Sequence, residues 1–237
     1  MPINLSVPGR ICLFGDKIDI AHKPVIAAAV DIFMHISASA MDDPDAAVYS
    51  RDLNVTERFT IGEQPETCGA LKYVQAAAWL LRERLPAGFC MEVQSDIPIG
   101  AGLSTSAALT VGAIMALDEL FGLGMRRDEI AETAYIAEHD VCGVSCGRMD
   151  QYAIAFGGVT FISTGEPASA EVLDIDELPV VVGDTSEPGR RMRFSPACAG
   201  DLRMMTPWYL TRSTSCINIR WMGGRRWWGE TPPALAN

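Results

Sequence analysis

The stretch from Pro98 to Ala108, PIGAGLSTSAA, holds the residue types best suited to chemistry in this 237-residue sequence. Gly100 and Gly102 come just before three hydroxyl residues, and the apolar positions that follow, up to Leu120, recur at helical spacing. Glycines let a backbone approach an anion, and the free N–H groups of a first helical turn add the positive end of the helix dipole. The pattern predicts a site for an anion, most simply a phosphate chain, although a loop that only caps a helix has the same pattern. The hydroxyls available to phosphate oxygens or a magnesium ion are those of Ser104, Thr105 and Ser106.

A second group of charged residues lies near the beginning of the chain, in VPGRICLFGDKIDI (residues 7–20). Arg10 follows a Pro-Gly turn signal and opens a short alternating segment typical of a strand, and Asp16, Lys17 and Asp19 lie at its other end. Two carboxylates and two cations within ten residues suit a polyhydroxyl ligand. The same residues are also typical of a solvated loop, and without other information we favour that interpretation.

A third polar passage, GVSCGRMDQY (residues 143–152), contains Asp150 and comes before an apolar run, residues 153–162, that we interpret as a strand. Other strands are predicted at residues 10–14, 25–38, 89–95 and 180–184, with a strand pair within 47–61. Helices are predicted at 71–85, from the glycine-rich loop to 121, and from an N-cap at Asp128 to about 141.

The overall composition excludes several classes of protein. Apolar residues make up 49% and charged residues 21%, as in soluble globular proteins. The net charge of −11 argues against nucleic acid and against an anionic membrane as partners. The N-terminus lacks the features of a signal peptide, and no apolar run approaches 18 residues, so we expect a cytoplasmic protein. The seven cysteines follow no disulfide framework and are expected to be reduced.

The composition changes abruptly at residue 185. Residues 185–237 carry eight Arg, no Lys, three acidic residues and four of the five Trp. Periodic Leu, Ile and Val stretches disappear there as well. We therefore divide the chain into residues 1–184 and an atypical Arg/Trp-rich segment, 185–237.

Three passages in this order, PGRICLFGDKID, PIGAGLSTSAA and AEHDVCGVSCGRMDQY, resemble the small-molecule kinases of the GHMP superfamily. The Cys-Gly-x-Met-Asp-Gln run in the third passage is most similar to galactokinases. The resemblance covers roughly residues 7–184 and implies an α+β fold. Residues 1–184 would form an N-terminal, ATP-binding domain of the ribosomal protein S5 domain 2 type, a mixed sheet backed by helices. It also implies that the C-terminal ferredoxin-like domain of the family is largely missing and that residues 185–237 stand in its place.

Roles for individual residues follow from the same resemblance. It implies that Mg²⁺ is held by Ser106 and Glu138, that Asp150 is the catalytic base and that Arg10 is its charged partner. Phosphoryl transfer depends mainly on positioning and charge neutralisation, which suits such a set. The ATP phosphates would be held by Pro98, Gly100, Ala101, Gly102, Leu103, Ser104, Thr105, Ser106 and Ala107.

The resemblance also implies where the acceptor binds. The residues expected around it are Arg10, Asp16, Lys17, Asp19, Gly147 and Asp150. Galactokinases carry Glu-His-x-Asp-Tyr where this chain has Asp-Lys-Ile-Asp-Ile, so galactose itself is not implied. The resemblance implies instead that the acceptor is a small hydroxyl compound, above all a sugar phosphorylated at its anomeric hydroxyl.

Two alternatives remain open at this stage. One is a kinase of mevalonate type that acts in isoprenoid synthesis. The other is a catalytically impaired fragment or a non-catalytic relative that binds nucleotide or sugar, because the second glycine-rich segment of the family has no match here. The sequence leaves the oligomeric state open.

Overall fold

The computed structural model describes residues 2–66, 68–175, 178, 180–184 and 215–219. Nearly all of the segment 185–237 lies outside these residues, and so do the predictions for it, including the replaced C-terminal domain. The strands are β1 (Ile3–Phe14), β2 (Val25–Ala40), β3 (Asp45–Ser50), β4 (Val55–Thr60), β5 (Phe89–Ser95), β6 (Val159–Ser163), β7 (Ser169–Val172), β8 (Val180–Asp184) and β9 (Ser215–Ile219). The helices are α1 (Lys72–Leu81), α2 (Thr105–Phe121), α3 (Arg127–Ile136) and α4 (Met149–Phe156), with a 3₁₀ turn at Asp19–Ala21 and a π-helical turn at Ala137–Val141.

Seven strands form one mixed sheet, and the long strand β2 is its centre. β1 runs antiparallel along one side of β2, while β5 and β6 pair with two different portions of its other side. β3 lies next to β5 and is parallel to it, and β4 lies beyond β3 at the edge of the sheet. On the other portion of β2, β7 pairs with β6. β8 and β9 form a separate antiparallel pair.

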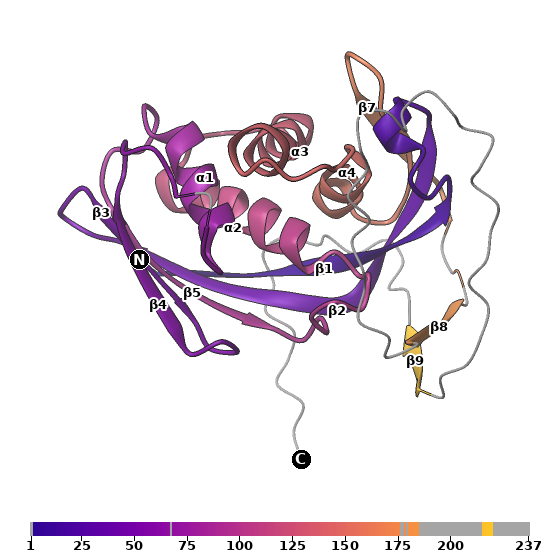
Figure 1. The fold of residues 1–237 in the computed structure, drawn as a ribbon, viewed down its shortest axis with the longest axis horizontal. Coiled ribbons are helices and arrows are strands. Elements are labelled where there is room, and N and C mark those ends of the chain that lie inside the picture. Colours follow the sequence, from indigo (N-terminus) through magenta and orange to yellow (C-terminus); the bar gives the residue numbers. More distant parts are fainter. Residues whose placement is uncertain (1, 67, 176–177, 179, 185–214, 220–237) are drawn as a thin grey trace.

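The four helices cover one face of this sheet (Figure 1). α2 is the central one and packs on β1 and β2 and against the other three helices. It approaches the sheet so closely that a Cβ added at Gly112 would lie 2.5 Å from Ile36 and 2.9 Å from Val7. Buried Ala, Val, Ile and Leu side chains lie around most of its circumference, which explains its weak amphipathic character. No helix in the described part of the chain is long and apolar enough to span a bilayer.

The predicted mixed α/β architecture is confirmed, and most predicted elements are present. One is wrong: residues 153–156 belong to α4, and the strand β6 starts only at Val159. A short apolar run fits a buried helix as well as a strand, and Gly157 and Gly158, both at φ of 70°, separate the two elements. A smaller error concerns Asp128, which lies inside the first turn of α3 and pairs with Arg126, the residue at the actual N-cap.

The glycine-rich segment before α2 runs along β1. The backbone N–H of Arg10 donates to the carbonyl of Leu103 over 3.1 Å. A Cβ at Gly9 would lie only 3.0 Å from that same carbonyl oxygen, so the small residue permits the close approach. The beginning of the chain therefore fixes the position of the predicted phosphate loop.

Candidate functional site

Arg10 and Asp150, 140 positions apart, meet at the N-terminal end of α2. The guanidinium Nε of Arg10 donates to Asp150 Oδ1 over 2.7 Å, and its Nη1 donates to the backbone carbonyl of Gly102, also over 2.7 Å. Ser104 Oγ donates to the second carboxylate oxygen of Asp150 over 2.6 Å. The predicted catalytic pair is thus bonded directly to the predicted phosphate loop.

The backbone of that loop has the conformation needed to present N–H groups. Gly100 and Gly102 have φ of 83° and 78°, and Ser104, with φ of 62°, also lies in the left-handed region. Helix α2 starts at Thr105, and no side chain caps its N-terminus. The amides of its first turn are therefore available to an anion.

Asp150 is held as a carboxylate. Its side chain is 28% exposed. Partial burial raises its pKa, but the charge of Arg10 and the hydrogen bonds from Arg10 and Ser104 outweigh that effect and lower it below the ordinary value. Asp150 is the second residue of α4, where the helix dipole also favours negative charge.

Glu138, in the π-helical turn after α3, is the most deeply buried acid of the site, with 2% of its surface exposed. Burial and the nearby charge of Asp150 raise its pKa to about 7, against hydrogen bonds from Gln151, Thr110 and Ser106. Its Oε1 atom has no hydrogen-bond partner. A buried carboxyl oxygen without a partner is available to a cation, which would compensate the cost of burying it.

These residues fit a magnesium ion that binds with a nucleotide. Mg²⁺ commonly uses one or two protein carboxylates and takes its remaining oxygens from phosphates and water. Glu138 and the neighbouring hydroxyl of Ser106 supply such a set. The described residues contain no cluster of three His, Cys, Asp or Glu side chains that could bind a metal unaided.

The predicted acceptor residues fall into two groups. Asp16 and Lys17 are exposed in the turn after β1, whereas Asp19 is buried. The backbone N–H of Met149 donates to Asp19 Oδ2 over 3.4 Å, and a Cβ added at Gly147 would lie 2.2 Å from that oxygen. Only a glycine fits there without displacing the carboxylate. Asp19 and Gly147 line a cavity of about 450 Å³, of which Asp16 and Lys17 are not part.

Arg148 forms one wall of this cavity. It makes a two-pronged hydrogen-bonded ion pair with Glu132 and lies over the ring of Tyr135, 4.2 Å from its centroid. Because Arg148 is only 7% exposed, this arrangement fixes the backbone next to Gly147. Arg148 was not among the predicted site residues, since a single Arg in a polar passage has no distinguishing pattern.

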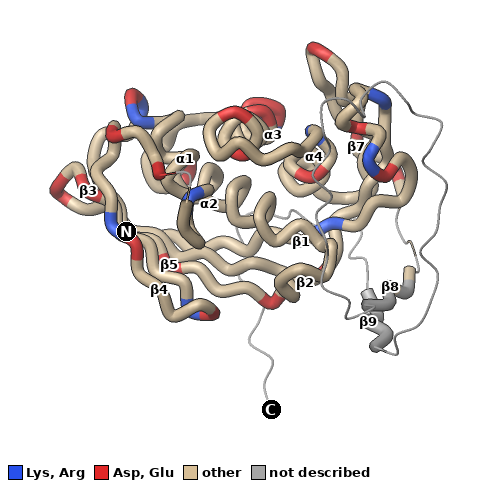
Figure 2. The backbone as a smooth tube through the Cα atoms, in the orientation of Figure 1, with Lys and Arg blue, Asp and Glu red and all other residues tan. Residues whose placement is uncertain are grey.

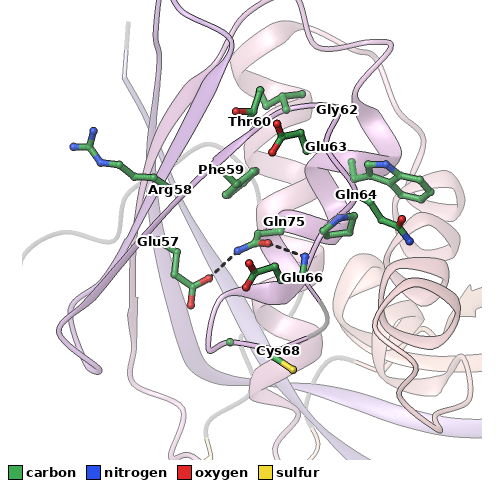
Figure 3. Close-up of a pocket in the computed structure, with 14 residues that line it drawn as sticks. Glu57, Arg58, Phe59, Thr60, Gly62, Glu63, Gln64, Glu66, Cys68 and Gln75 are labelled. Carbon is green, nitrogen blue, oxygen red and sulfur yellow. Dashed lines mark hydrogen bonds between the residues drawn. The ribbon is translucent and has the colours of Figure 1, made fainter.

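A second cavity, of about 380 Å³, lies between β4, the segment after it and α1. Figure 3 shows its carboxylates, Glu57, Glu63 and Glu66, and a buried Gln75 whose carboxamide links Glu57 to the backbone of Glu66. None of the predicted site residues lines it.

Acidic positions are spread over the loops and helices of the described chain (Figure 2). A favourable field for a phosphate must therefore arise locally, from the backbone amides at α2 and from Arg10 and Lys17. Burial and the charge of Asp150 raise the pKa of Asp19, and the nearby Lys17 opposes that rise. Lys17 also contributes to the lowered pKa of Asp150, after Arg10 and Ser104.

The structure thus brings together Arg10, Ser104, Ser106, Glu138 and Asp150, with Asp19 and Gly147 beside them. Their roles remain predictions. One detail differs from expectation: the Ser104 hydroxyl, expected to face phosphate, is bonded to Asp150. Gln151, which follows Asp150 in the quoted Met-Asp-Gln run, was not among the predicted site residues either.

Comparison with known proteins identifies the family of the chain. Residues 72–158 match the family model "GHMP kinases N terminal domain". Among curated relatives, a mevalonate kinase of Pyrococcus furiosus is 33% identical over 201 residues, covering 80% of this chain and 59% of its own length. A galactokinase of the same organism is 32% identical over 167 residues, covering 68% and 47%.

Solved structures give the same result. The crystal structure of Lactococcus lactis galactokinase complexed with galactose matches with a TM-score of 0.70 at 27% identity, covering 80% of this chain and 52% of that one. The chain thus spans about half to three-fifths of the length of these relatives. It contains the N-terminal domain of the GHMP kinases and is a member of that superfamily.

Proposed function

We propose that the chain is an ATP- and Mg²⁺-dependent kinase that phosphorylates a hydroxyl of a small polyol, most specifically a sugar at its anomeric position. Residues 1–184 would be its ATP-binding domain. The observation that carries the proposal is the bonding of Asp150, through Arg10 and Ser104, to the loop that opens α2. A carboxylate fixed at a phosphate-binding loop can accept a proton from an alcohol that binds beside the phosphate.

In the proposed step, the acceptor oxygen forms a bond to the γ-phosphorus of ATP. The bond from that phosphorus to the bridging β-phosphate oxygen breaks, ADP leaves, and the hydroxyl proton passes to Asp150. Arg10 holds Asp150 ionised until then and places positive charge near the phosphoryl group. The backbone amides at α2 hold the phosphates. Bound Mg²⁺, held by Ser106 and Glu138, would neutralise phosphate charge.

The charges around the acceptor region support a neutral polyol. Asp16, Asp19 and Asp150 carry three negative charges against the two positive charges of Arg10 and Lys17. The fixed carboxylate of Asp19 suits acceptance of hydrogen bonds from sugar hydroxyls. An acceptor that carries its own carboxylate would be repelled by this set.

A kinase of mevalonate type is the second candidate. The observation in its favour is the 33% identity to the P. furiosus mevalonate kinase, which extends over more of this chain than the match to the galactokinase.

The test uses the full 237-residue chain. ADP release from MgATP is measured with galactose, other hexoses, pentoses, uronic acids, mevalonate and homoserine, and nucleotide binding is measured by calorimetry. We expect turnover with a neutral sugar. Turnover with mevalonate alone would establish the second candidate, and nucleotide binding without turnover on any acceptor would identify a non-catalytic relative or an impaired fragment.

A further inference from the structure

Gln151 is a buried polar side chain whose carbonyl oxygen has no partner. It is 1% exposed, and its Oε1 and the Oε1 of Glu138 are the two buried side-chain polar atoms without a hydrogen bond among the described residues. The two side chains are neighbours, because the amide of Gln151 is among the groups that act on the Glu138 carboxyl and oppose the rise of its pKa. Two unsatisfied oxygens therefore lie on neighbouring side chains.

Gln75 shows how a buried glutamine is normally accommodated in this fold. Its amide donates to Glu57 over 3.0 Å, and its carbonyl accepts from the backbone N–H of Glu66 over 3.3 Å (Figure 3). A buried carbonyl that lacks a donor gives up its hydrogen bond to water without replacing it, which destabilises the folded chain. Gln151 carries this cost and Gln75 does not.

Reorienting the Gln151 carboxamide does not remove the problem. Its Nε2 lies 4.0 Å from Cys146 Sγ and is the group that can donate to the Glu138 carboxylate. Half a turn of the amide would bring the carbonyl against that carboxylate in its ionised form, the form that a cation binds, and two acceptors would then be in contact. A cation bound by Gln151 Oε1 and Glu138 Oε1 would give both oxygens a partner.

We propose that the side-chain carbonyl of Gln151 supplies a third protein oxygen, after Ser106 and Glu138, to the divalent cation that binds with the nucleotide. An amide carbonyl is a hard oxygen ligand of the kind that Mg²⁺ and Mn²⁺ accept. This inference rests on the proposed function, and it adds a residue whose contribution to cation binding is separate from the transfer step.

The test measures Mn²⁺ binding to the full chain by electron paramagnetic resonance, in the presence of ADP. Gln151→Met removes the carbonyl at similar side-chain volume, and Gln151→Glu keeps an oxygen. Gln75→Met is the matched control, a buried glutamine away from the site. We expect Gln151→Met to weaken Mn²⁺ binding about 10-fold or more, the size typical of groups that support a metal. Gln151→Glu should bind Mn²⁺ at least as tightly as the parent chain, and Gln75→Met should bind it equally.

The outcomes separate the two proposals. If the parent chain binds Mn²⁺ with ADP and Gln151→Met binds it as tightly as Gln75→Met does, the role of Gln151 is wrong while the proposed function stands. If the parent chain binds no Mn²⁺ with nucleotide, the proposed function fails and this inference with it. Circular dichroism checks that each variant is folded. Should Gln151→Met not fold, weaker Mn²⁺ binding by Gln151→Glu than by the parent chain would overturn the inference.

Discussion

Replacing Glu138 with glutamine is expected to change how the stability of the protein depends on pH. Burial and the charge of Asp150 raise the pKa of Glu138 from 4.5 to about 7. Between these two values the folded chain binds more protons than the unfolded chain. The free energy of unfolding therefore falls as pH rises through this window, and the contribution of the protonated form is lost above pH 7.

The size of the effect follows from the shift. One pKa unit corresponds to 1.36 kcal/mol, so the parent chain loses about 3 kcal/mol from this group as pH rises from 4.5 to 8. About 2 kcal/mol of that loss falls between pH 5.5 and 8.5. Glutamine does not titrate, and Glu138→Gln avoids the loss. Asp150 has a lowered pKa and is ionised in both proteins over this range, so it does not contribute to the difference.

The assay is urea unfolding of both proteins at several pH values from 5.5 to 8.5, in a chelating buffer without nucleotide. The difference in free energy of unfolding, variant minus parent, should grow by about 2 kcal/mol across this range. Glu83→Gln, at a side chain that is 85% exposed, is the control and should show a constant difference. A pH-independent difference for Glu138→Gln would refute the claim that the buried carboxyl carries this cost.

Three further predictions concern single positions. Asp150→Asn should lower turnover about 10²–10⁴-fold in the ADP-release assay and leave nucleotide affinity measured by calorimetry nearly unchanged, since the carboxylate acts on the acceptor; comparable turnover would remove Asp150 from the mechanism. Gly147→Ala should displace the Asp19 carboxylate, whose oxygen lies 2.2 Å from the added Cβ, and raise KM for the acceptor with little change in KM for ATP; equal effects on both would contradict this assignment. Gly112→Ala should destabilise the fold by about 1–3 kcal/mol in urea unfolding, because its Cβ would lie 2.5 Å from Ile36, and an unchanged midpoint would show that α2 can shift away from the sheet.

The spacing of apolar residues predicted most of the helices and strands, and it failed where the same spacing fits both a helix and a strand. The spacing of apolar residues located α2 because a long run of helical spacing that ends at a glycine has one interpretation. Residues 153–156, a short apolar run, fitted both a strand and a helix, and only their burial against the neighbouring helices decided for α4. Propensity and spacing contain no information of that kind.

The candidate site was predictable to the extent that its residues occur in recognisable runs. Arg10, Ser106, Glu138 and Asp150 each stand in a quoted passage, and their proximity agrees with the resemblance. The bond from Ser104 to Asp150 depends on a left-handed backbone at Ser104. The side-chain carbonyl of Gln151 has no hydrogen bond because no donor lies within reach of it in the folded chain. Both are properties of three-dimensional packing, which residue types alone do not specify.

The bonds made by Arg10 also bear on when the site is assembled. One side chain joins the first strand to residues 92 and 140 positions later in the chain. During synthesis the ribosome releases the N-terminal segment first, so β1 and β2 can pair long before Asp150 has emerged. During that interval Arg10 has no carboxylate partner, and the ion pair can form only when α4 folds onto the sheet. Formation of the Arg10–Asp150 pair would therefore mark the docking of α4 beside the phosphate loop, whereas β6 and β7, which complete the sheet, are synthesised after it.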